Sequence, residues 1–522
     1  QLKGNMIKFF LLLFFPLVIG FSPVEDSGEK SLPLKIAPSF SGNYGELRGG
    51  RFHAGVDFRV GGVVGEPVYS IDDGYICRVS VAPSGYGNGI YIRHHDGTMS
   101  VYGHLHRFRD DIAEMVKEAQ YAKESFSVTL EFSENELPVS RGEYIGNVGN
   151  SGSSAAPHLH LEVRSKDGKG PINMIAEGYF KHDDKTPPII SRINFYSIYA
   201  DTVGVIHTEP IGSFGKKYNK VIEVPEASYV AVDAIDKQYG TPAKLGIEVY
   251  EVFLDGESVY RYKVGNYTYF EQNTFNSLIE YGERVRSGRN MIKSYVEPGN
   301  AFDIESVNRG VILLGDDKVH NLRVVVEDLD GNKDVARYRI RKKRESESDS
   351  ILVSKANHLY STPLLWFLPF AYTNDGLSLS LPPKAFYSNQ LFTVDSVSRG
   401  DICTYSKIWD IHTPFVPLNK AGIIELRVEN LPDDLQPKAF IAHLTPGGDY
   451  VYCGGKYEDG AVRGRLSSFG RFTVGVDTIP PVIKPRFSSP DRIARSGQAA
   501  FTIKDSLSGI RRYRAQIDGK WI

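Results

Sequence analysis

Pro157-His158-Leu159-His160-Leu161-Glu162-Val163 is the stretch that decides the fold of the N-terminal region, because it alternates as a β-strand does. Residues two apart in a strand face the same side, roughly 7 Å apart. We therefore expect His158 and His160 on one face, where one imidazole can bind a metal while the other reaches a substrate. A chance His-x-His on an exposed strand is the competing interpretation, and His104-Leu105-His106 is such a decoy candidate.

Two earlier patterns also place metal-binding side chains at a useful spacing. They are His53-Ala54-Gly55-Val56-Asp57, in which Gly55 permits a tight backbone, and Tyr102-Gly103-His104. His and Asp together suit a zinc ion held by three protein ligands with one position open, which is a hydrolytic catalyst. The chain has no His-Glu-x-x-His and no Gly-x-Ser-x-Gly motif, so other hydrolase signatures are absent.

A glycine-rich loop, Gly146-Asn147-Val148-Gly149-Asn150-Ser151-Gly152, precedes the His-x-His strand. It lacks the Lys-Ser/Thr of a phosphate-binding loop and the strand-to-helix context of a dinucleotide site. We interpret it as a bend that lets a substrate backbone approach.

Short strands dominate the rest of this region. Hairpins are predicted around Asp73-Gly74 and Asp96-Gly97, and a helix over residues 111–122, whose residues Ile112, Met115 and Val116 share a face. Aromatic residues make up 12% of the chain, with 51 Gly and 28 Pro, which favours strands joined by turns.

The composition sets broad limits. A chain of 522 residues is too long for one core, so three or four domains are expected. A net charge of −2 gives no indication of a nucleic-acid binder. Of the 3 Cys, Cys403 and Cys453 could pair and leave Cys77 over, but buried free thiols fit equally well.

The N-terminus carries an apolar run over residues 9–21, directly after Lys8. This run is short for a membrane span but suits the hydrophobic region of a signal peptide. We expect residues 1–22 to be a signal peptide and the protein to be exported to the periplasm or cell envelope. An uncleaved N-terminal anchor is the alternative.

The later chain contains an internal repeat. Asp184-Lys185-Thr186-Pro187-Pro188-Ile189-Ile190 returns as Asp477-Thr478-Ile479-Pro480-Pro481-Val482-Ile483. A Pro-Pro entry followed by alternating strands and Asp-Gly turns predicts immunoglobulin-like β-sandwiches. The expected domains are 37–183, an immunoglobulin-like domain at 185–340, a charged linker at 341–350, a β-rich domain at 351–476, and an incomplete immunoglobulin-like domain at 477–522.

Taken together, these motifs resemble the lysostaphin/LytM-type zinc metallopeptidases that cut peptidoglycan peptides. The resemblance covers about residues 40–180 and rests on the patterns above, and the flanking repeats look like those of Bacteroidetes-type members. It implies a mainly β protein, with an N-terminal antiparallel β-sheet metallopeptidase domain followed by immunoglobulin-like β-sandwich domains. An insertion at about residues 110–136 departs from the family pattern where a groove wall is expected.

By that resemblance, His53, Asp57 and His160 bind one Zn²⁺ per chain, and His158 and His104 are the catalytic pair. Two neutral imidazoles and one carboxylate leave a net positive site, in which a bound water ionises near neutral pH. With no Glu base in the motif, we expect His158 to take the proton and His104 to donate to the oxyanion, although the two roles can be exchanged.

The implied function is a zinc-dependent endopeptidase that cleaves peptide crosslinks of peptidoglycan. Its partners would be peptidoglycan peptides and, through the β-sandwich domains, cell-envelope proteins, but not nucleic acid. One alternative is a metal-free module of the same fold that binds the wall or activates amidases. Another is a wall-binding scaffold in which the sandwich domains do the main work.

Overall fold

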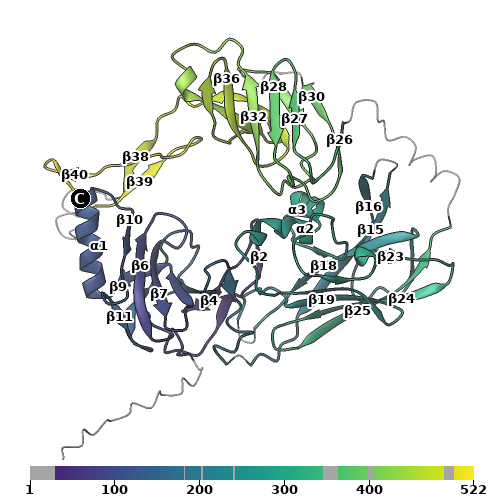
Figure 1. Ribbon diagram of the computed structural model, residues 1–522, viewed down its shortest axis with the longest axis horizontal. Helices are drawn as coiled ribbons and strands as arrows, with labels where there is room; N and C mark the ends of the chain where they lie inside the picture. Colours follow the sequence, from purple (N-terminus) through teal and green to yellow (C-terminus); the bar gives the residue numbers. More distant parts are fainter. Residues whose placement is uncertain are drawn as a thin grey trace, which may run out of the picture.

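The computed structural model describes residues 30–181, 183–201, 204–238, 241–344, 362–397, 405–486 and 499–522. The expected signal peptide and Cys403 lie outside these residues. Within them the protein is mainly β, as predicted (Figure 1). A search of the same residues finds no helix of the length and apolar character needed to cross a membrane.

The N-terminal body is built on a 9-stranded sheet whose strands pair antiparallel. Its order is β1 (Phe40–Gly42), β4 (Val56–Arg59), β13 (His158–Arg164), β8 (Met99–Gly103), β7 (Asn88–His94), β6 (Gly74–Val81) and β10 (Val128–Glu131). Two short strands extend it, because β11 (Pro138–Val139) pairs with β6 and β14 (Pro171–Ile172) pairs with β13.

A second layer covers this sheet. It contains the 3-stranded sheet β5 (Pro67–Tyr69), β12 (Tyr144–Val148) and β9 (Leu105–Phe108), followed by α1 (Asp110–Lys123). The predicted helix is confirmed, and Ile112 and Val116 are its buried residues. The inserted strand β10 pairs with β6 at the sheet edge opposite β1 and β4, so it does not lie beside the predicted metal ligands as a groove wall would.

One predicted hairpin is confirmed and the other is wrong. β7 and β8 pair antiparallel around Asp96-Gly97, with Ile90 opposite Tyr102. At Asp73-Gly74 the chain instead crosses between sheets, because β5 pairs with β12 while β6 pairs with β7. A Cβ at Gly74 would lie 2.2 Å from the carbonyl oxygen of Arg93, so this glycine serves close strand approach and not a hairpin turn.

The second body consists of two sheets that enclose one core. The first contains β16 (Ile206–Phe214), β15 (Ile189–Ala200), β18 (Ala227–Ile235), β21 (Ile292–Lys293) and β23 (Ile312–Leu313). The second contains β17 (Val221–Val224), β25 (Lys333–Lys342), β24 (Val319–Glu327), β19 (Val249–Leu254), β20 (Glu257–Lys263) and β22 (Glu305–Ser306). Short helical turns lie between strands: η1 (Glu271–Thr274), α2 (Phe275–Leu278), α3 (Tyr281–Ser287) and η2 (Asn308–Gly310).

The expected linker begins later than predicted. Arg341 and Lys342 belong to β25, which pairs in parallel with β17. Arg341 contacts Glu223 at 2.7 Å and Lys342 contacts Glu226 at 2.6 Å, so two charges that suggested a solvated linker instead pair with acids along a sheet edge.

The third body also has two main sheets. One contains β27 (Phe370–Thr373), β28 (Leu377–Leu381), β32 (Gly422–Arg427), β36 (Ala461–Leu466) and β35 (Lys456–Glu458). The other contains β30 (Val394–Val397), β31 (Ile408–Ile411), β37 (Gly470–Val476), β33 (Ala439–Leu444) and β34 (Tyr450–Tyr452). A separate pair joins β26 (Thr362–Leu364) to β29 (Gln390–Phe392), and η4 (Gln436–Lys438) precedes β33.

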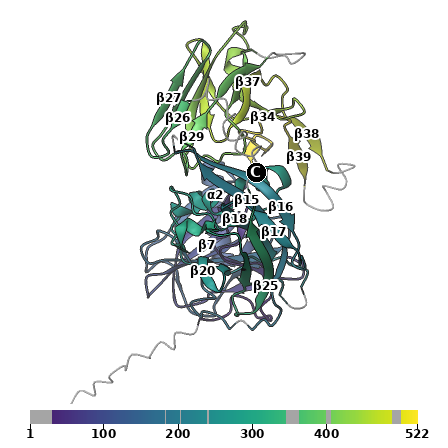
Figure 2. The ribbon, with the colours of Figure 1, turned by 90° about the vertical axis from the view of Figure 1, so that its right-hand side faces the viewer.

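The last residues return toward the first body. β38 (Val482–Pro485) pairs with β39 (Phe501–Lys504), and β40 (Gln516–Ile517) with β41 (Lys520–Trp521). Figure 1 shows these yellow hairpins beside α1, and Figure 2 shows the third body above the other two. Arg514 forms an ion pair with Glu124 at 2.5 Å, and the Trp521 ring packs edge-on against Tyr121.

The first two bodies share side chains. Tyr44 and Phe52 are buried in the core of the second body. Tyr44 precedes the hairpin of β2 (Leu47–Arg48) and β3 (Arg51–Phe52), and Phe52 is the last residue of β3. In return, Leu245 is buried in the core of the first. The predicted metal ligand His53 directly follows Phe52, so this interface lies immediately behind the predicted site.

Candidate metal centre

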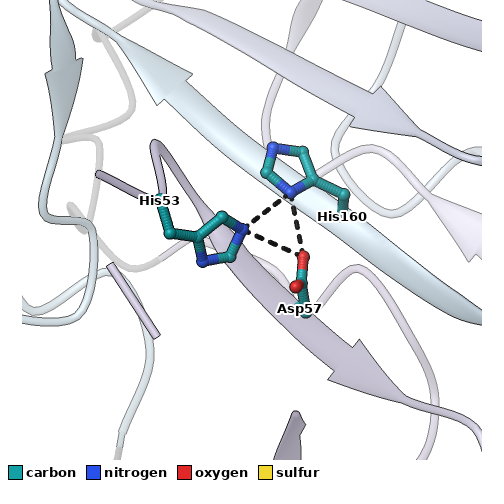
Figure 3. A group of neighbouring side chains, drawn as sticks. All are labelled: His53, Asp57 and His160. Carbon is teal, nitrogen blue, oxygen red and sulfur yellow. Dashed lines mark hydrogen bonds and ion pairs between the residues drawn. The ribbon is translucent and has the colours of Figure 1, made fainter. Parts of the chain in front are cut away.

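Three side chains converge where β4 meets β13. Cross-strand pairing puts Asp57 of β4 directly opposite His160 of β13, and His53 reaches the same point from the turn before β4. His53 Nε2 lies 3.0 Å from His160 Nδ1 and 3.1 Å from Asp57 Oδ1. His160 Nδ1 lies 2.9 Å from the same carboxylate oxygen, which closes the triangle in Figure 3.

Gly55 makes this convergence sterically feasible. A Cβ at this position would lie 2.3 Å from the carbonyl oxygen of Leu161 and 3.0 Å from Cε1 of His160. Only glycine therefore lets the turn between His53 and Asp57 press against β13.

A backbone hydrogen bond determines which ring nitrogen of His53 faces Asp57 and His160. His53 Nδ1 donates to the backbone carbonyl of Asn43 at 2.8 Å, so Nε2 carries the lone pair directed at the other two groups. Burial lowers the pKa of His53, which keeps this ring neutral.

The donor set fits a zinc ion. Ligand atoms about 2.0–2.1 Å from tetrahedral zinc lie about 3.3 Å from one another, close to the three separations observed. His53, Asp57 and His160 are only 5%, 3% and 6% exposed, and one oxygen and two nitrogen atoms are the ligands that zinc takes in hydrolytic sites. These three residues could therefore hold zinc.

The second oxygen of Asp57 is bound separately. Arg48 donates to Asp57 Oδ2 at 2.6 Å, which leaves Oδ1 as the oxygen directed at the two imidazoles. Burial opposes ionisation of Asp57, but His53, His158 and His160 together hold its pKa well below the usual value. The carboxylate is thus ionised and oriented to offer one oxygen.

A buried carboxylate stands behind His160. Glu162 Oε2 lies 3.6 Å from His160 Nε2, and Tyr86 and Tyr269 donate their hydroxyls to this carboxylate. Arg164 Nε also donates to Glu162, at 2.7 Å. Burial alone would raise the pKa of Glu162, but His160, Arg164 and Tyr269 lower it to about 2, so the group is an anion behind the imidazole.

The second body supplies part of this support. Tyr269 belongs to the segment between β20 and η1, whose Tyr267 hydroxyl donates to the carbonyl of His53 at 3.1 Å. From the same region Gln272 donates to the carbonyl of Phe52 at 3.0 Å. The sequence analysis did not identify the supporting residues, because no local pattern marks them: Asn43, Arg48, Glu162, Tyr267, Tyr269 and Gln272. Glu162 is the one that the sequence could have indicated, since it shares a strand face with His158 and His160.

The two predicted catalytic histidines lie beside the triangle. The ring centroids of His104 and His158 are 4.8 Å apart, and those of His104 and His160 are 6.0 Å apart. His158 Nε2 lies 3.4 Å from Asp57 Oδ1, while its Nδ1 contacts the carbonyl of Ala156 at 2.8 Å. The structure therefore brings all five sequence-predicted residues together.

His104 is held by the glycine-rich loop. Its backbone has a positive φ of 62°, and its Nδ1 contacts the carbonyl of Ser151 at 2.8 Å. Ser151 Oγ in turn accepts from the backbone N–H of Asn88 at 2.9 Å. The loop also approaches the backbone of Gly87 closely, since a Cβ at Gly152 would lie 2.3 Å from the nitrogen of Gly87. The loop predicted to admit substrate also orients this imidazole.

Two other residues take ordinary structural positions. His106, the decoy candidate, is exposed. Tyr102 is fully buried, and its hydroxyl accepts from the backbone N–H of Ile71 at 2.9 Å.

Comparison with known proteins identifies this part of the chain. Residues 51–125, which include His53, Asp57 and His104, match the model of Peptidase family M23. The chain contains a peptidase family M23 domain. Residues 362–477 match a Zu5-like domain, within the third body.

Two relatives and two solved structures each cover less than a third of this chain. The DD-carboxypeptidase/endopeptidase Mpg of Neisseria meningitidis serogroup B is 34% identical over 114 residues, which cover 22% of this chain and 20% of the relative. Mpg of Neisseria gonorrhoeae is 33% identical over the same share. The chain thus matches only about a fifth of the length of these relatives.

Among solved structures, the catalytic domain of lysostaphin from Staphylococcus simulans is 25% identical, with 26% of this chain and 90% of that chain covered and a TM-score of 0.20. The catalytic domain of the M23 protein EnpA from Enterococcus faecalis is 23% identical, with 29% and 91% covered and a TM-score of 0.19.

The first prediction concerns the metal ligands. Replacing His53, Asp57 or His160 with Ala should release most of the zinc, because a site with three protein ligands loses a third of them in each variant. Metal analysis of the purified variants measures this, with the exposed His106→Ala as the matched control. Zinc retained in His160→Ala but lost in His106→Ala would refute the assignment.

The second prediction concerns the support from the second body. Tyr269→Phe removes one hydroxyl from Glu162 and should weaken zinc binding about 10–100-fold, the usual effect of losing a group that orients a ligand. Competition with a zinc chelator gives the affinity. Tyr121→Phe, at an exposed tyrosine on α1, is the control, and equal affinities in the two variants would exclude a role for Tyr269.

Proposed function

We propose that this protein is a zinc-dependent endopeptidase that cleaves peptide crosslinks of bacterial peptidoglycan. The observation that carries the proposal is the convergence of His53 Nε2, Asp57 Oδ1 and His160 Nδ1, with two further imidazoles beside them, in an M23 domain. The similarity to a DD-carboxypeptidase/endopeptidase supports a peptidase.

Zinc bound by these three side chains would supply Lewis-acid activation of a water nucleophile and of the substrate carbonyl. The protein supplies the groups that bind it and the groups that move protons. Arg48 orients Asp57 through a hydrogen bond to its second oxygen, and the Glu162 carboxylate lies 3.6 Å behind Nε2 of His160.

The two remaining histidines would handle the protons. Burial lowers the pKa of His104 to about 4, so its ring is neutral at neutral pH, and with Nδ1–H directed at Ser151 its Nε2 accepts a proton. We therefore prefer the exchanged assignment of roles, in which His104 takes the proton from water and returns it to the leaving amine. His158, whose side chain is 16% exposed, would then donate to the developing oxyanion.

Location and partners follow from this proposal. The apolar run at residues 9–21 supports export to the periplasm or cell envelope, with an uncleaved anchor as the alternative. Peptidoglycan peptides would be the substrate, and the later β bodies would contact cell-envelope proteins. A metal-free regulatory module is the competing function, but all five site residues are present and converge.

The third prediction tests the substrate. Incubation of the zinc-loaded protein with crosslinked muropeptides should convert dimers to monomers with new amino termini, detected by mass spectrometry. Release of peptide-free glycan strands would indicate an amidase instead, and no turnover by a fully zinc-loaded protein would favour the regulatory module.

The fourth prediction tests the catalytic pair. His158→Ala and His104→Ala should each retain zinc but lose about 10²–10⁴-fold in turnover, as expected when an acid–base or oxyanion group is removed. Muropeptide cleavage and metal content are measured on the same samples. Turnover close to that of the unmodified protein in either variant would remove that histidine from the mechanism.

A further inference from the structure

We propose that Asp184, Asp236 and Asp328 form a second cation site, for a hard divalent ion of the calcium class, where the M23 domain joins the second body. Each residue offers a carboxylate oxygen, and these oxygens all lie within 4.8 Å of one another. The three residues are 5%, 6% and 3% exposed. This proposal is independent of the proposed function.

The three carboxylates come from separate parts of the second body. Asp184 lies just ahead of β15, Asp236 directly follows β18, and Asp328 directly follows β24. β15 and β18 belong to one sheet and β24 to the other. A cation bound here would therefore join the ends of both sheets.

The carboxylate of Asp236 is the group in this cluster that needs a ligand. Its Oδ1 is buried and has no hydrogen-bond partner within the part of the chain that the structure covers. Asp328, by contrast, accepts from the backbone N–H groups of Asp330 and Asn332, both at 2.9 Å, and from Asn332 Nδ2 at 2.8 Å. A buried carboxylate oxygen without a donor is costly unless a cation or a proton neutralises it.

The described residues supply no basic partner for Asp236 or Asp328. Over the described residues, neither Asp236 nor Asp328 forms an ion pair with Lys, Arg or His. Burial, together with the nearby carboxylates of Asp328, Asp184 and Asp330, raises the pKa of Asp236 to about 7. Burial also raises the pKa of Asp328. Carboxylate oxygens that repel one another in this way are the ligands that Ca²⁺ prefers.

The second copy of the internal repeat has counterparts of Asp184 and Asp236. In the first copy Ile189 pairs with Ile235, and Asp236 is the next residue. In the second copy Val482, which also follows Pro-Pro, pairs with Lys504, and Asp505 is the next residue. Asp477 occupies the position of Asp184, and it accepts from the backbone N–H of Ser508, in the turn that Asp505 begins. The register that brings Asp184 and Asp236 together is thus a property of the repeated unit.

The proposed site would stabilise the contact with the M23 domain. Gln238, two residues after Asp236, accepts from the backbone N–H of Phe40 at 2.8 Å. Asn43 exchanges hydrogen bonds with Gly246 at 2.7 and 2.9 Å, and the carbonyl of the same Asn43 orients His53. A cation at the end of β18 would therefore hold the segment on which Asn43 rests.

The experiment uses the full chain loaded with one equivalent of zinc, dialysed free of other metals and titrated with CaCl₂, with MgCl₂ in a parallel titration. Calorimetry should detect Ca²⁺ binding, and the melting temperature should rise by about 5–10 °C once Ca²⁺ is about a hundredfold above its dissociation constant. Mg²⁺ should bind more weakly, because it gives up its water ligands reluctantly.

Asp236→Asn should abolish the Ca²⁺-dependent rise while melting, without Ca²⁺, at or above the temperature of the unmodified protein, because it removes one repelling charge. Asp183→Asn is the matched control, since Asp183 is exposed and lies next to Asp184. If Asp236→Asn does not fold, Asp328→Asn serves in its place. The proposal is overturned if Ca²⁺ does not raise the melting temperature of the unmodified protein, or if it still raises that of the Asp→Asn variant.

Discussion

The pairing of β4 with β13 is the constraint on which the rest of the site depends. It sets Asp57 opposite His160 in adjacent strands, and every other group is arranged around that pair. A shift of one residue in this register would turn one of the two side chains to the opposite face. The core residues Val56, Phe58, Leu159 and Leu161, which alternate with them, oppose such a shift because they are buried on the other side of the same two strands.

The site is also supported from outside the M23 fold. Glu162 is held by Tyr86 and Arg164 from within the domain and by Tyr269 from the second body. Tyr267 binds the carbonyl of His53, so the second body contacts the backbone of one predicted ligand and the carboxylate behind another. A carboxylate behind a ligand histidine fixes the ring orientation and increases its basicity.

Much of the predicted ligand geometry is readable in the sequence because it is local. The alternation around His158 and His160 predicts a strand with both imidazoles on one face, and Gly55 permits the tight approach between His53 and Asp57. Asn43, Arg48 and Tyr269 could not be predicted, because tertiary packing alone brings them to the site. Asp73-Gly74 was misread for a related reason: a turn signal shows that the chain bends, but not which strand pairs next. The three acidic residues of the second body each resemble ordinary turn residues, and only the folded chain places them together.

The exchange of aromatic side chains between the first two bodies limits how this protein could have been assembled. Tyr44 and Phe52 of the first body are buried in the core of the second, and Leu245 of the second body is buried in the core of the first. Beside a different neighbour, the M23 domain would lose both the core that buries Phe52 and the hydroxyl that reaches Glu162. We therefore expect the residues on the two sides of this interface to change together.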